Sequence, residues 1–303
     1  MTKRKKAALG VLGALVLAVA VACIVYVVRV PDMTIYFDSG KGDALTMQTK
    51  TGVIQKIKLP GYDKVSFATP FDGGYYCRAE KGENDYFLLV QDGQVTGELA
   101  APDYAETLYV DEMGAAADGL YAACSVGENL QKVLFADFAN GRITELPLTD
   151  GRWQAYLATQ GGTALLGRGG ESAPYICRWQ NGRLQELVQG TAPVLLSETQ
   201  FLYEDVYTEE HGSRLMLYDL ATGEAKPAAQ KVNFDLYSAG LGWSAAPFTP
   251  NGWLVGWRGG IPMYEATALL SGITVTNVDS GESYWLPTTL GRDASHLQAI
   301  ANA

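Results

Sequence analysis

Side chains that commonly perform catalysis are sparse in this chain. A zinc site needs three or four nitrogen or sulfur ligands. His211 stands beside Glu209 and Glu210 in a polar stretch, and the only other histidine is His296, near the C-terminus. The GxSxG, HExxH, P-loop and dinucleotide-binding glycine patterns are missing from the sequence. We therefore expect no metal site, no cofactor and no set of catalytic residues.

The cysteines do not suggest redox or metal chemistry either. Cys23 lies in an apolar run, and Cys77, Cys124 and Cys177 occur without any CxxC or Cys/His spacing. Cys77 and Cys124 fall in corresponding strands of adjacent repeats, but at different distances from the turn glycines, so a disulfide between them is not implied. We expect these three residues to be buried as small hydrophobic side chains.

Aromatic and ionic residues recur at one place in the chain's repeat, in the segments that join successive units. Tyrosine and tryptophan give large, rigid contact areas with few torsions, which suits recognition of a protein, peptide or glycan. In the alternative interpretation, the same aromatics only fill space between neighbouring units. The candidate ligand-binding residues are Tyr62, Asp63, Tyr104, Arg152, Trp153, Asp235, Tyr237, Arg258 and Arg292.

The units that must position these residues are hairpins of a repeating kind. The phrase "ICRWQNGRLQEL" joins two apolar-alternating runs through Asn-Gly, which is a strong hairpin signal because both residues accept positive φ. Similar phrases centre on Gly52, Gly93, Gly141, Gly182, Gly223 and Gly281, at spacings of 41, 48, 41, 41 and 58 residues. A second pair of short apolar runs precedes the last five of these hairpins, so each full unit reads as strands A, B, C and D.

This period predicts an all-β fold, a six-bladed β-propeller of four-stranded antiparallel blades. The first unit lacks strand A, and the C-terminal "HLQAIANA" supplies a matching segment, which we place beside "MTIYF" to close the ring. Closure of this kind also removes an exposed sheet edge. A seven-bladed ring, with one blade in the long stretch after Gly223, and a set of unrelated hairpins in a β-sandwich stay open as alternatives.

The hairpins "LMLYDLATGEA" and "TVTNVDSGES" resemble the C–D hairpins of bacterial TolB-like, quinoprotein-like and WD-repeat propellers. The resemblance covers residues 30–303 in period and implies the fold. It carries over no catalytic residue, because the quinoprotein tryptophan-docking motifs and the WD dipeptide are missing. "DSGESYW" resembles the Asp-box of sialidases, but it occurs once and its upstream position is Asn277 rather than serine.

The N-terminus predicts a membrane anchor. Residues 1–6 contain four basic residues, and an apolar run without charge follows from Ala7 to Val28. As a helix those 22 residues would span about 33 Å, enough for the hydrocarbon core. We predict a cytoplasmic tail at 1–6, a transmembrane signal anchor at 7–29 and an extracytoplasmic propeller at 30–303, in accordance with the positive-inside rule. A lipoprotein attached at Cys23, and cleavage elsewhere, are the alternatives.

The net charge of residues 30–303 limits the classes of binding partner that we expect. Residues 30–303 contain 18 basic and 33 acidic residues, a net charge of −15, which disfavours nucleic acid and anionic lipid as partners. The sequence therefore favours a monomeric, cell-surface binding or scaffolding module without enzymatic activity, in contact with the membrane only through its anchor. A propeller enzyme (lactonase, glycan lyase or hydrolase) and an extracellular sensor working with a membrane partner are the alternatives.

Overall fold

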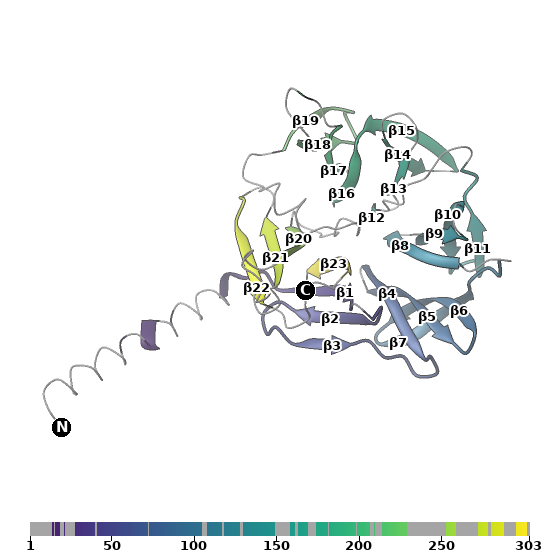
Figure 1. Cartoon of the computed structure of the whole chain (residues 1–303), viewed down its shortest axis with the longest axis horizontal. Helices are drawn as coiled ribbons and strands as arrows, with labels where there is room; N and C mark the ends of the chain where they lie inside the picture. The colour runs from purple at the N-terminus through teal and green to yellow at the C-terminus, as the bar shows by residue number, and fades with distance from the viewer. Residues whose placement is uncertain are drawn as a thin grey trace, which may run out of the picture.

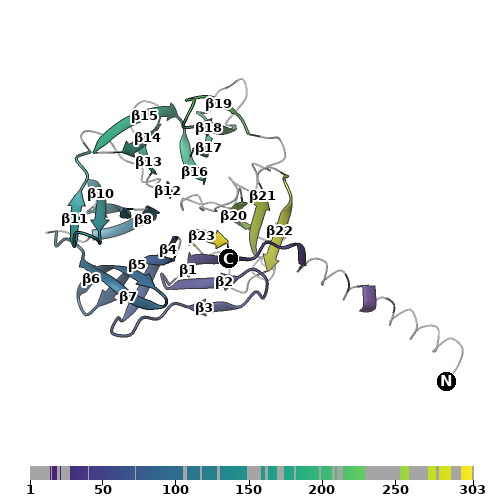
Figure 2. The same cartoon turned by 180° about the vertical axis from the view of Figure 1, so that it is seen from behind.

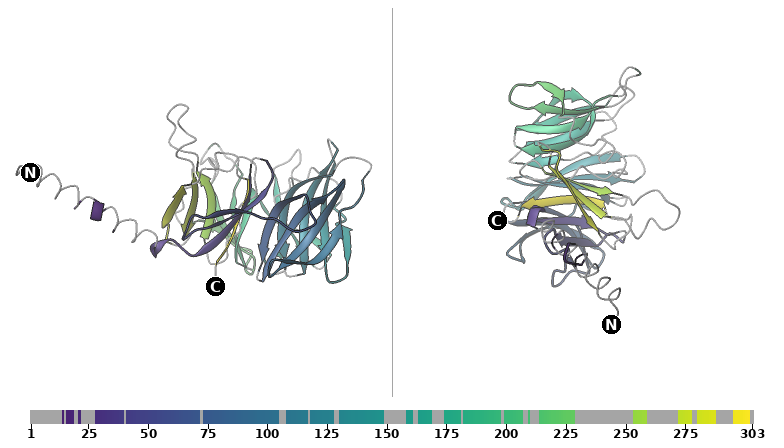
Figure 3. Two further views of the ribbon diagram at one scale, coloured as in Figure 1. Left: turned by 90° about the horizontal axis from the view of Figure 1, so that it is seen from below. Right: turned by 90° about the vertical axis from the view of Figure 1, so that its left-hand side faces the viewer.

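The fold is a ring of antiparallel sheets. The computed structural model describes residues 14, 16–18, 21, 28–39, 41–71, 73–104, 108–116, 118–127, 130–148, 158–160, 163–168, 174–180, 182–197, 199–206, 209, 214–228, 253–258, 272–277, 280–287 and 295–301. The sheets stand radially around a common centre (Figures 1 and 2), and seen from the side the ring is a flat disc (Figure 3). The chain is therefore an antiparallel β-propeller, as its repeats predict.

Five sheets have four strands in the order A-B-C-D, from the inside of the ring outward, and we call them blades 1 to 5. Their strands are, in blade 1, β23 (Ser295–Ala301), β1 (Met33–Asp38), β2 (Ala44–Gln48) and β3 (Ile54–Lys56); in blade 2, β4 (Lys64–Phe71), β5 (Gly74–Lys81), β6 (Asn84–Gln91) and β7 (Gln94–Ala100); in blade 3, β8 (Leu108–Ala116), β9 (Gly119–Val126), β10 (Leu130–Asp137) and β11 (Arg142–Glu145); in blade 4, β12 (Ala158–Gln160), β13 (Thr163–Arg168), β14 (Tyr175–Gln180) and β15 (Arg183–Gln189); and in blade 5, β16 (Thr191–Ser197), β17 (Gln200–Glu204), β18 (Leu215–Asp219) and β19 (Ala225–Pro227).

The last sheet corrects the prediction of six four-stranded blades. It contains β20 (Trp253–Arg258), β21 (Gly272–Asn277) and β22 (Ser283–Pro287), in that order, so its described part has three strands. The segment in which we expected its strand A, "LGWSAAPF", lies outside the described residues. Four-stranded blades therefore number five in the described part of the chain.

The predicted closure of the ring by the C-terminal strand is confirmed. β23 pairs antiparallel with β1, with Met33 opposite Ala301 and Ile35 opposite Ala299. Segments from the two ends of the chain thus share blade 1, which lies beside the three-stranded sheet (Figure 1). Among the described residues, no helix is both long enough and apolar enough to span a bilayer. Most of the predicted anchor, residues 7–29, falls outside them and stays a prediction.

The described residues form five hydrophobic core clusters, and each one lies between two neighbouring sheets. Phe87 of blade 2, for example, packs with Leu134 of blade 3, and both are at most 1% exposed. Burying a side chain of this size stabilises the fold by about 1.5–3 kcal/mol. The predicted burial of the cysteines is confirmed, because Cys77, Cys124 and Cys177 are each 0% exposed and free of disulfides.

The hairpin glycines have the predicted conformation, but the turns around them are of two kinds. All six glycines have positive φ, between 64° and 74°. A two-residue turn joins strands C and D in blade 2, where Asp92 also has positive φ, and in blade 4. In blades 1 and 5 and in the three-stranded sheet, the glycine N–H instead donates to the carbonyl four residues earlier, which makes a longer turn.

The innermost strands are irregular at a recurring place. Strand A shifts register against strand B in blades 1, 2, 3 and 5. Across each shift, strand A has one residue more than strand B. In blade 2 the irregularity holds Phe67 at a φ of 54°. Both carboxylate oxygens of the buried Asp38 accept a hydrogen bond from the Phe67 N–H, at 3.0 and 3.1 Å. Such bulges redirect side chains at sheet edges and near binding sites.

Candidate functional site

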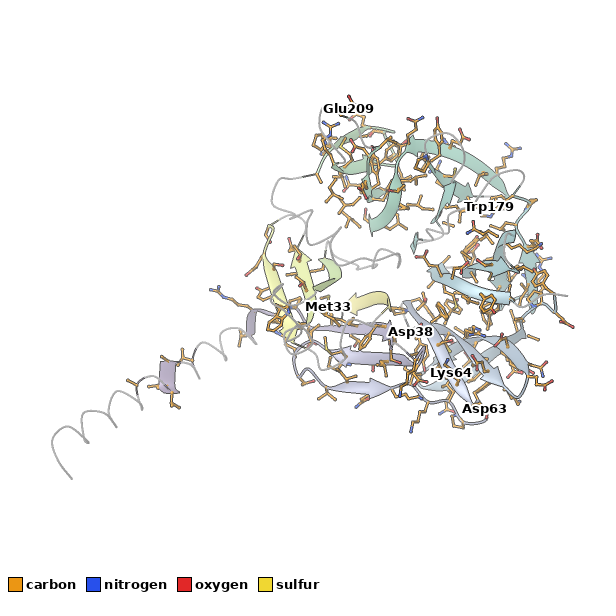
Figure 4. All side chains as sticks on the ribbon, in the orientation of Figure 1. Met33, Asp38, Asp63, Lys64, Trp179 and Glu209 are labelled. Carbon is orange, nitrogen blue, oxygen red and sulfur yellow. The ribbon has the colours of Figure 1, made fainter. Side chains whose placement is uncertain are left out.

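Tyr62 and Asp63, two of the predicted binding residues, join blade 1 to blade 2. The Tyr62 hydroxyl donates to the Glu98 carboxylate on β7, and its ring lies edge-on to Tyr86 on β6, at 6.2 Å. Burial, and then the neighbouring Glu98 carboxylate, raise the pKa of the Tyr62 hydroxyl. The Asp63 carboxylate accepts from the Gly82 N–H at 2.8 Å and so caps the β5–β6 turn. Both residues stabilise blade 2, and Figure 4 shows Asp63 on the outer side of the junction.

Tyr104 repeats the arrangement one blade further along. Its hydroxyl donates to the Glu145 carboxylate on β11 at 3.4 Å, and the Lys132 ammonium lies 5.2 Å from its ring centre. Lys132 also pairs with Glu145 at 2.5 Å. Burial, and then Glu145, raise the pKa of Tyr104 to about 12. Like Tyr62, this tyrosine rests on the outer strands of the next blade. This contact pattern matches the space-filling alternative, and ligand binding by either tyrosine stays a prediction.

The remaining predicted site residues cannot be placed as side chains. Arg258 ends β20, and only its backbone is described. The others lie outside the described residues: Arg152, Trp153, Asp235, Tyr237 and Arg292.

The structure adds a group of residues that the sequence analysis did not select, on strand A of blade 3. Tyr109 is 60% exposed although β8 is the innermost strand of its blade. Asp111 is exposed as well, and its carboxylate accepts a hydrogen bond of 2.6 Å from the Ser125 hydroxyl on β9. Tyr109 and Ser125 face each other in the strand register. We call Tyr109, Asp111 and Ser125 the blade 3 rim.

The blade 3 rim lies on the side of blade 3 that faces blade 4. Val110, between the two exposed residues, packs into the core shared with blade 2, and alternation along the strand turns Tyr109 to the opposite side. The hydrogen bond from Ser125, which faces Tyr109, places Asp111 on that side as well. β8 lies beside β12, the first strand of blade 4. The chain segment containing Arg152 and Trp153 leads directly into β12. An exposed tyrosine with an adjacent carboxylate and hydroxyl can stack on a ligand and accept hydrogen bonds from it.

Shifted titratable groups among the described residues have structural explanations. Burial raises the pKa of the Cys77 and Cys124 thiols, which keeps them protonated and unreactive. Hydrogen bonds within the C–D turns lower the pKa of the Asp137 and Asp219 carboxyls, mainly from Asn140 and Thr222. In the part of the chain that the structure describes, no three His, Cys, Asp or Glu side chains gather in a way that could hold a metal ion.

Comparison with known proteins supports the fold. No family model and no curated protein matches the sequence. TolB from Acinetobacter baumannii is similar with a TM-score of 0.58 and 11% identity, over 89% of this chain and 66% of that chain. A chain of a nidogen/laminin complex has a TM-score of 0.52 and 10% identity, over 89% and 98%. A puromycin hydrolase S511A mutant complexed with PGG has a TM-score of 0.53 and 12% identity, over 82% and 42%.

The chain therefore spans just under two thirds of the TolB chain and less than half of the hydrolase chain. At such identities the likeness concerns the fold alone. The protein is a β-propeller of the general shape that TolB also has.

Proposed function

We propose that this protein is a binding or scaffolding module without enzymatic activity, displayed outside the cell on an N-terminal membrane anchor. The observation that carries the proposal is the blade 3 rim. Tyr109 is 60% exposed on an innermost strand, beside an exposed carboxylate. Its ring therefore adds little to the packing between blades, where a side chain at this position could be buried. Exposed aromatics of this kind are typical of recognition surfaces.

The chemistry of the described groups supports binding rather than catalysis. A catalytic carboxyl or thiol needs a pKa moved toward its working pH. The shifted thiols move further from neutrality, and the shifted carboxyls, Asp137 and Asp219, stay ionised inside turns. These shifts follow from packing and turn formation, and none of them prepares a group for proton transfer.

The blade 3 rim suits a neutral or basic ligand with hydrogen-bond donors. Asp111 brings a negative charge to the rim, and residues 30–303 carry −15 in all. A glycan offers hydroxyl donors and an apolar sugar face for Tyr109, whereas a peptide offers N–H groups and basic side chains. We expect a protein, peptide or glycan ligand, no nucleic acid, and a monomeric ectodomain.

The test uses purified residues 30–303 on glycan and peptide arrays. Tyr109→Ala should abolish or strongly weaken binding of any ligand that the unmodified ectodomain captures. Tyr284→Phe is the control, since it removes a hydroxyl that donates to Glu282 within the three-stranded sheet, away from the blade 3 rim, and it should leave binding intact. Unchanged binding by Tyr109→Ala would contradict the role of the blade 3 rim.

The alternative function is a propeller enzyme, because a hydrolase is among the solved structures with this shape. Incubating captured ligands with the ectodomain and analysing them by mass spectrometry separates the two functions. A cleaved or rearranged ligand supports the enzyme, whereas an intact ligand supports the binding module.

A further inference from the structure

The segment ahead of β1 is fixed to the propeller without a flexible linker. Val30 is 2% exposed and packs in the core between blade 1 and the three-stranded sheet. The Thr49 hydroxyl donates to the Pro31 carbonyl at 2.6 Å and accepts from the Met33 N–H at 2.9 Å. The Lys50 ammonium donates to the Val28 carbonyl at 3.0 Å. The β2–β3 hairpin therefore holds the chain at the point where the apolar run of residues 7–28 ends.

This hairpin differs from the other C–D hairpins at two positions. The residue after the turn glycine is Val53 in blade 1, and it is 48% exposed. The five corresponding residues are polar or charged: Gln94, Arg142, Arg183, Glu224 and Glu282. Two places before the glycine, blade 1 has Lys50, whereas blades 2 to 5 have Gln91, Ala139, Gln180 and Ala221. Blade 1 thus has a basic residue before the turn glycine and an exposed apolar residue after it, and blades 2 to 5 have neither at these positions.

Charge and exposure mark the same corner of the molecule. Val28 is 71% exposed, and Arg29 beside it is exposed too. Residues 44–62, which contain the β2–β3 hairpin and the segment after it, include three lysines and no acidic residue, although the ectodomain as a whole carries −15. Asp43 and Asp63 flank this stretch, and Asp43 pairs with Lys56 at 2.8 Å. We call Val28, Arg29, Lys50 and Val53 the blade 1 corner.

We infer that the blade 1 corner contacts the lipid headgroups of the membrane that holds the anchor, so that the propeller is docked on the bilayer rather than tethered above it. The inference rests on the proposed anchor. It replaces the expectation, drawn from the net charge of residues 30–303, that the protein contacts the membrane only through the anchor, because the blade 1 corner is locally basic. Only Arg29 lies between Val28 and the buried Val30, so the two are two residue steps apart, a reach of at most about 7 Å. The headgroup layer of one leaflet is about 5–8 Å thick. The corner is therefore within reach of the headgroups, where lysine and arginine pair with anionic lipid and valine enters the apolar boundary.

Docking at this corner fixes how the ring faces its surroundings. The described residues 28–30 leave the ring at its outer rim beside β22, and not from its centre (Figures 1 and 3). Blade 3 lies across the ring from β22 (Figure 1). The ring would stand edge-on to the bilayer, with the blade 3 rim on the side away from the lipid and accessible to a partner outside the cell.

The test places an environment-sensitive fluorophore on the full chain in vesicles of phosphatidylglycerol and phosphatidylcholine. The labelled variants are Val53→Cys and, as the matched control at the same hairpin position of blade 5, Glu224→Cys, both with Cys23→Ser. The other cysteines are 0% exposed and should not react. We expect the label at position 53 to shift its emission to the blue and to be quenched by lipid-attached nitroxide, and the label at position 224 to do neither.

Vesicle flotation and alkaline extraction of the same samples separate the two proposals. A chain that floats with the vesicles but keeps the label at position 53 as water-exposed as the one at position 224 would overturn the docking alone. A chain that does not float would overturn the anchor, and the docking with it. Lys50→Gln, which gives blade 1 the residue of blades 2 and 4, should reduce quenching at position 53 without lowering the melting temperature of the ectodomain.

Discussion

Removing β23 should open the ring, and the structure allows the cost to be worked out. Deleting residues 295–303 removes the whole strand that pairs with β1. Five residue pairs define that register, from Met33 opposite Ala301 to Asp38 opposite Ser295. If each pair contributes about one backbone hydrogen bond of about 0.5–1.5 kcal/mol net, the loss is about 3–7 kcal/mol. This is a large part of the about 5–15 kcal/mol that stabilises a typical domain.

The assay compares three ectodomains: residues 30–303, 30–301 and 30–294. Removing only Asn302 and Ala303 should be mild, because Ala301 is the last residue in register with β1. The 30–294 form should melt at least about 6 °C lower, given roughly 2 °C per kcal/mol for a domain of this size. It should also aggregate on size-exclusion chromatography, because the edge of β1 becomes available to other chains.

One result would refute this reasoning. If the 30–294 form stays monomeric and melts cooperatively at the temperature of the 30–303 form, the pairing of β23 with β1 does not stabilise the ring. The buried Met33, Ile35 and Phe37, each at most 1% exposed, would then be held by the three-stranded sheet and β2 without help from the C-terminus.

Three further predictions concern a turn, acid stability and the anchor. Gly182→Val should lower the free energy of unfolding by about 1–3 kcal/mol. The cause is backbone strain alone, because φ is 72° and an added Cβ would touch nothing within 4 Å. Gly182→Asn should be milder, and equal melting temperatures of the Gly182→Val variant and the wild type would contradict this. The pKa values of Asp137 and Asp219 are lowered in the folded state. The stability that these carboxylates add is therefore present above the unfolded pKa of about 4 and is lost as the pH falls through the folded pKa. In urea titrations below pH 4, the free energy of unfolding of Asp219→Asn should depend less on pH than that of the wild type. Cys23→Ser should leave the full chain in the membrane fraction with its N-terminus intact, whereas a mature N-terminus at a lipid-bearing Cys23 would favour the lipoprotein.

The repeat was visible in the sequence because its signals are local. Each turn glycine must adopt positive φ, and all six do. The turn length was less predictable. Asp219 accepts from the Ala221 and Thr222 N–H groups, which stabilises a longer turn that a simple X-Gly pattern does not reveal. The side chain of Asn277 accepts in the same way from the Ser280 N–H. These side-chain contacts compete with the two-residue turn that the X-Gly pattern suggests.

The site was harder to predict for a geometric reason. The period locates Tyr62 and Tyr104 within the repeat, but it does not give their distance from the ring centre, and both rest on outer strands of the next blade. Tyr109 was missed for another reason. Tyr109, Val110 and Asp111 alternate between exposed and buried, and alternation along a strand tells which face a side chain occupies but not whether the next blade covers that face.

The recurring irregularity of strand A suggests how one scaffold can present different surfaces. Opposite each shift, strand B keeps a buried residue in the inter-blade core: Phe37 in blade 1, Cys77 in blade 2, Cys124 in blade 3 and Tyr203 in blade 5, each at most 2% exposed. At these points strand A need not alternate strictly between buried and exposed side chains, because strand B supplies the residue that packs between the blades. Blade 2 uses this freedom to place Phe67 against Asp38, which ties two blades together. Blade 3 uses it to insert the exposed Asp111 close to Tyr109. Substitutions at the start of strand A should consequently alter recognition with little effect on folding, whereas substitutions at the strand B positions should do the reverse.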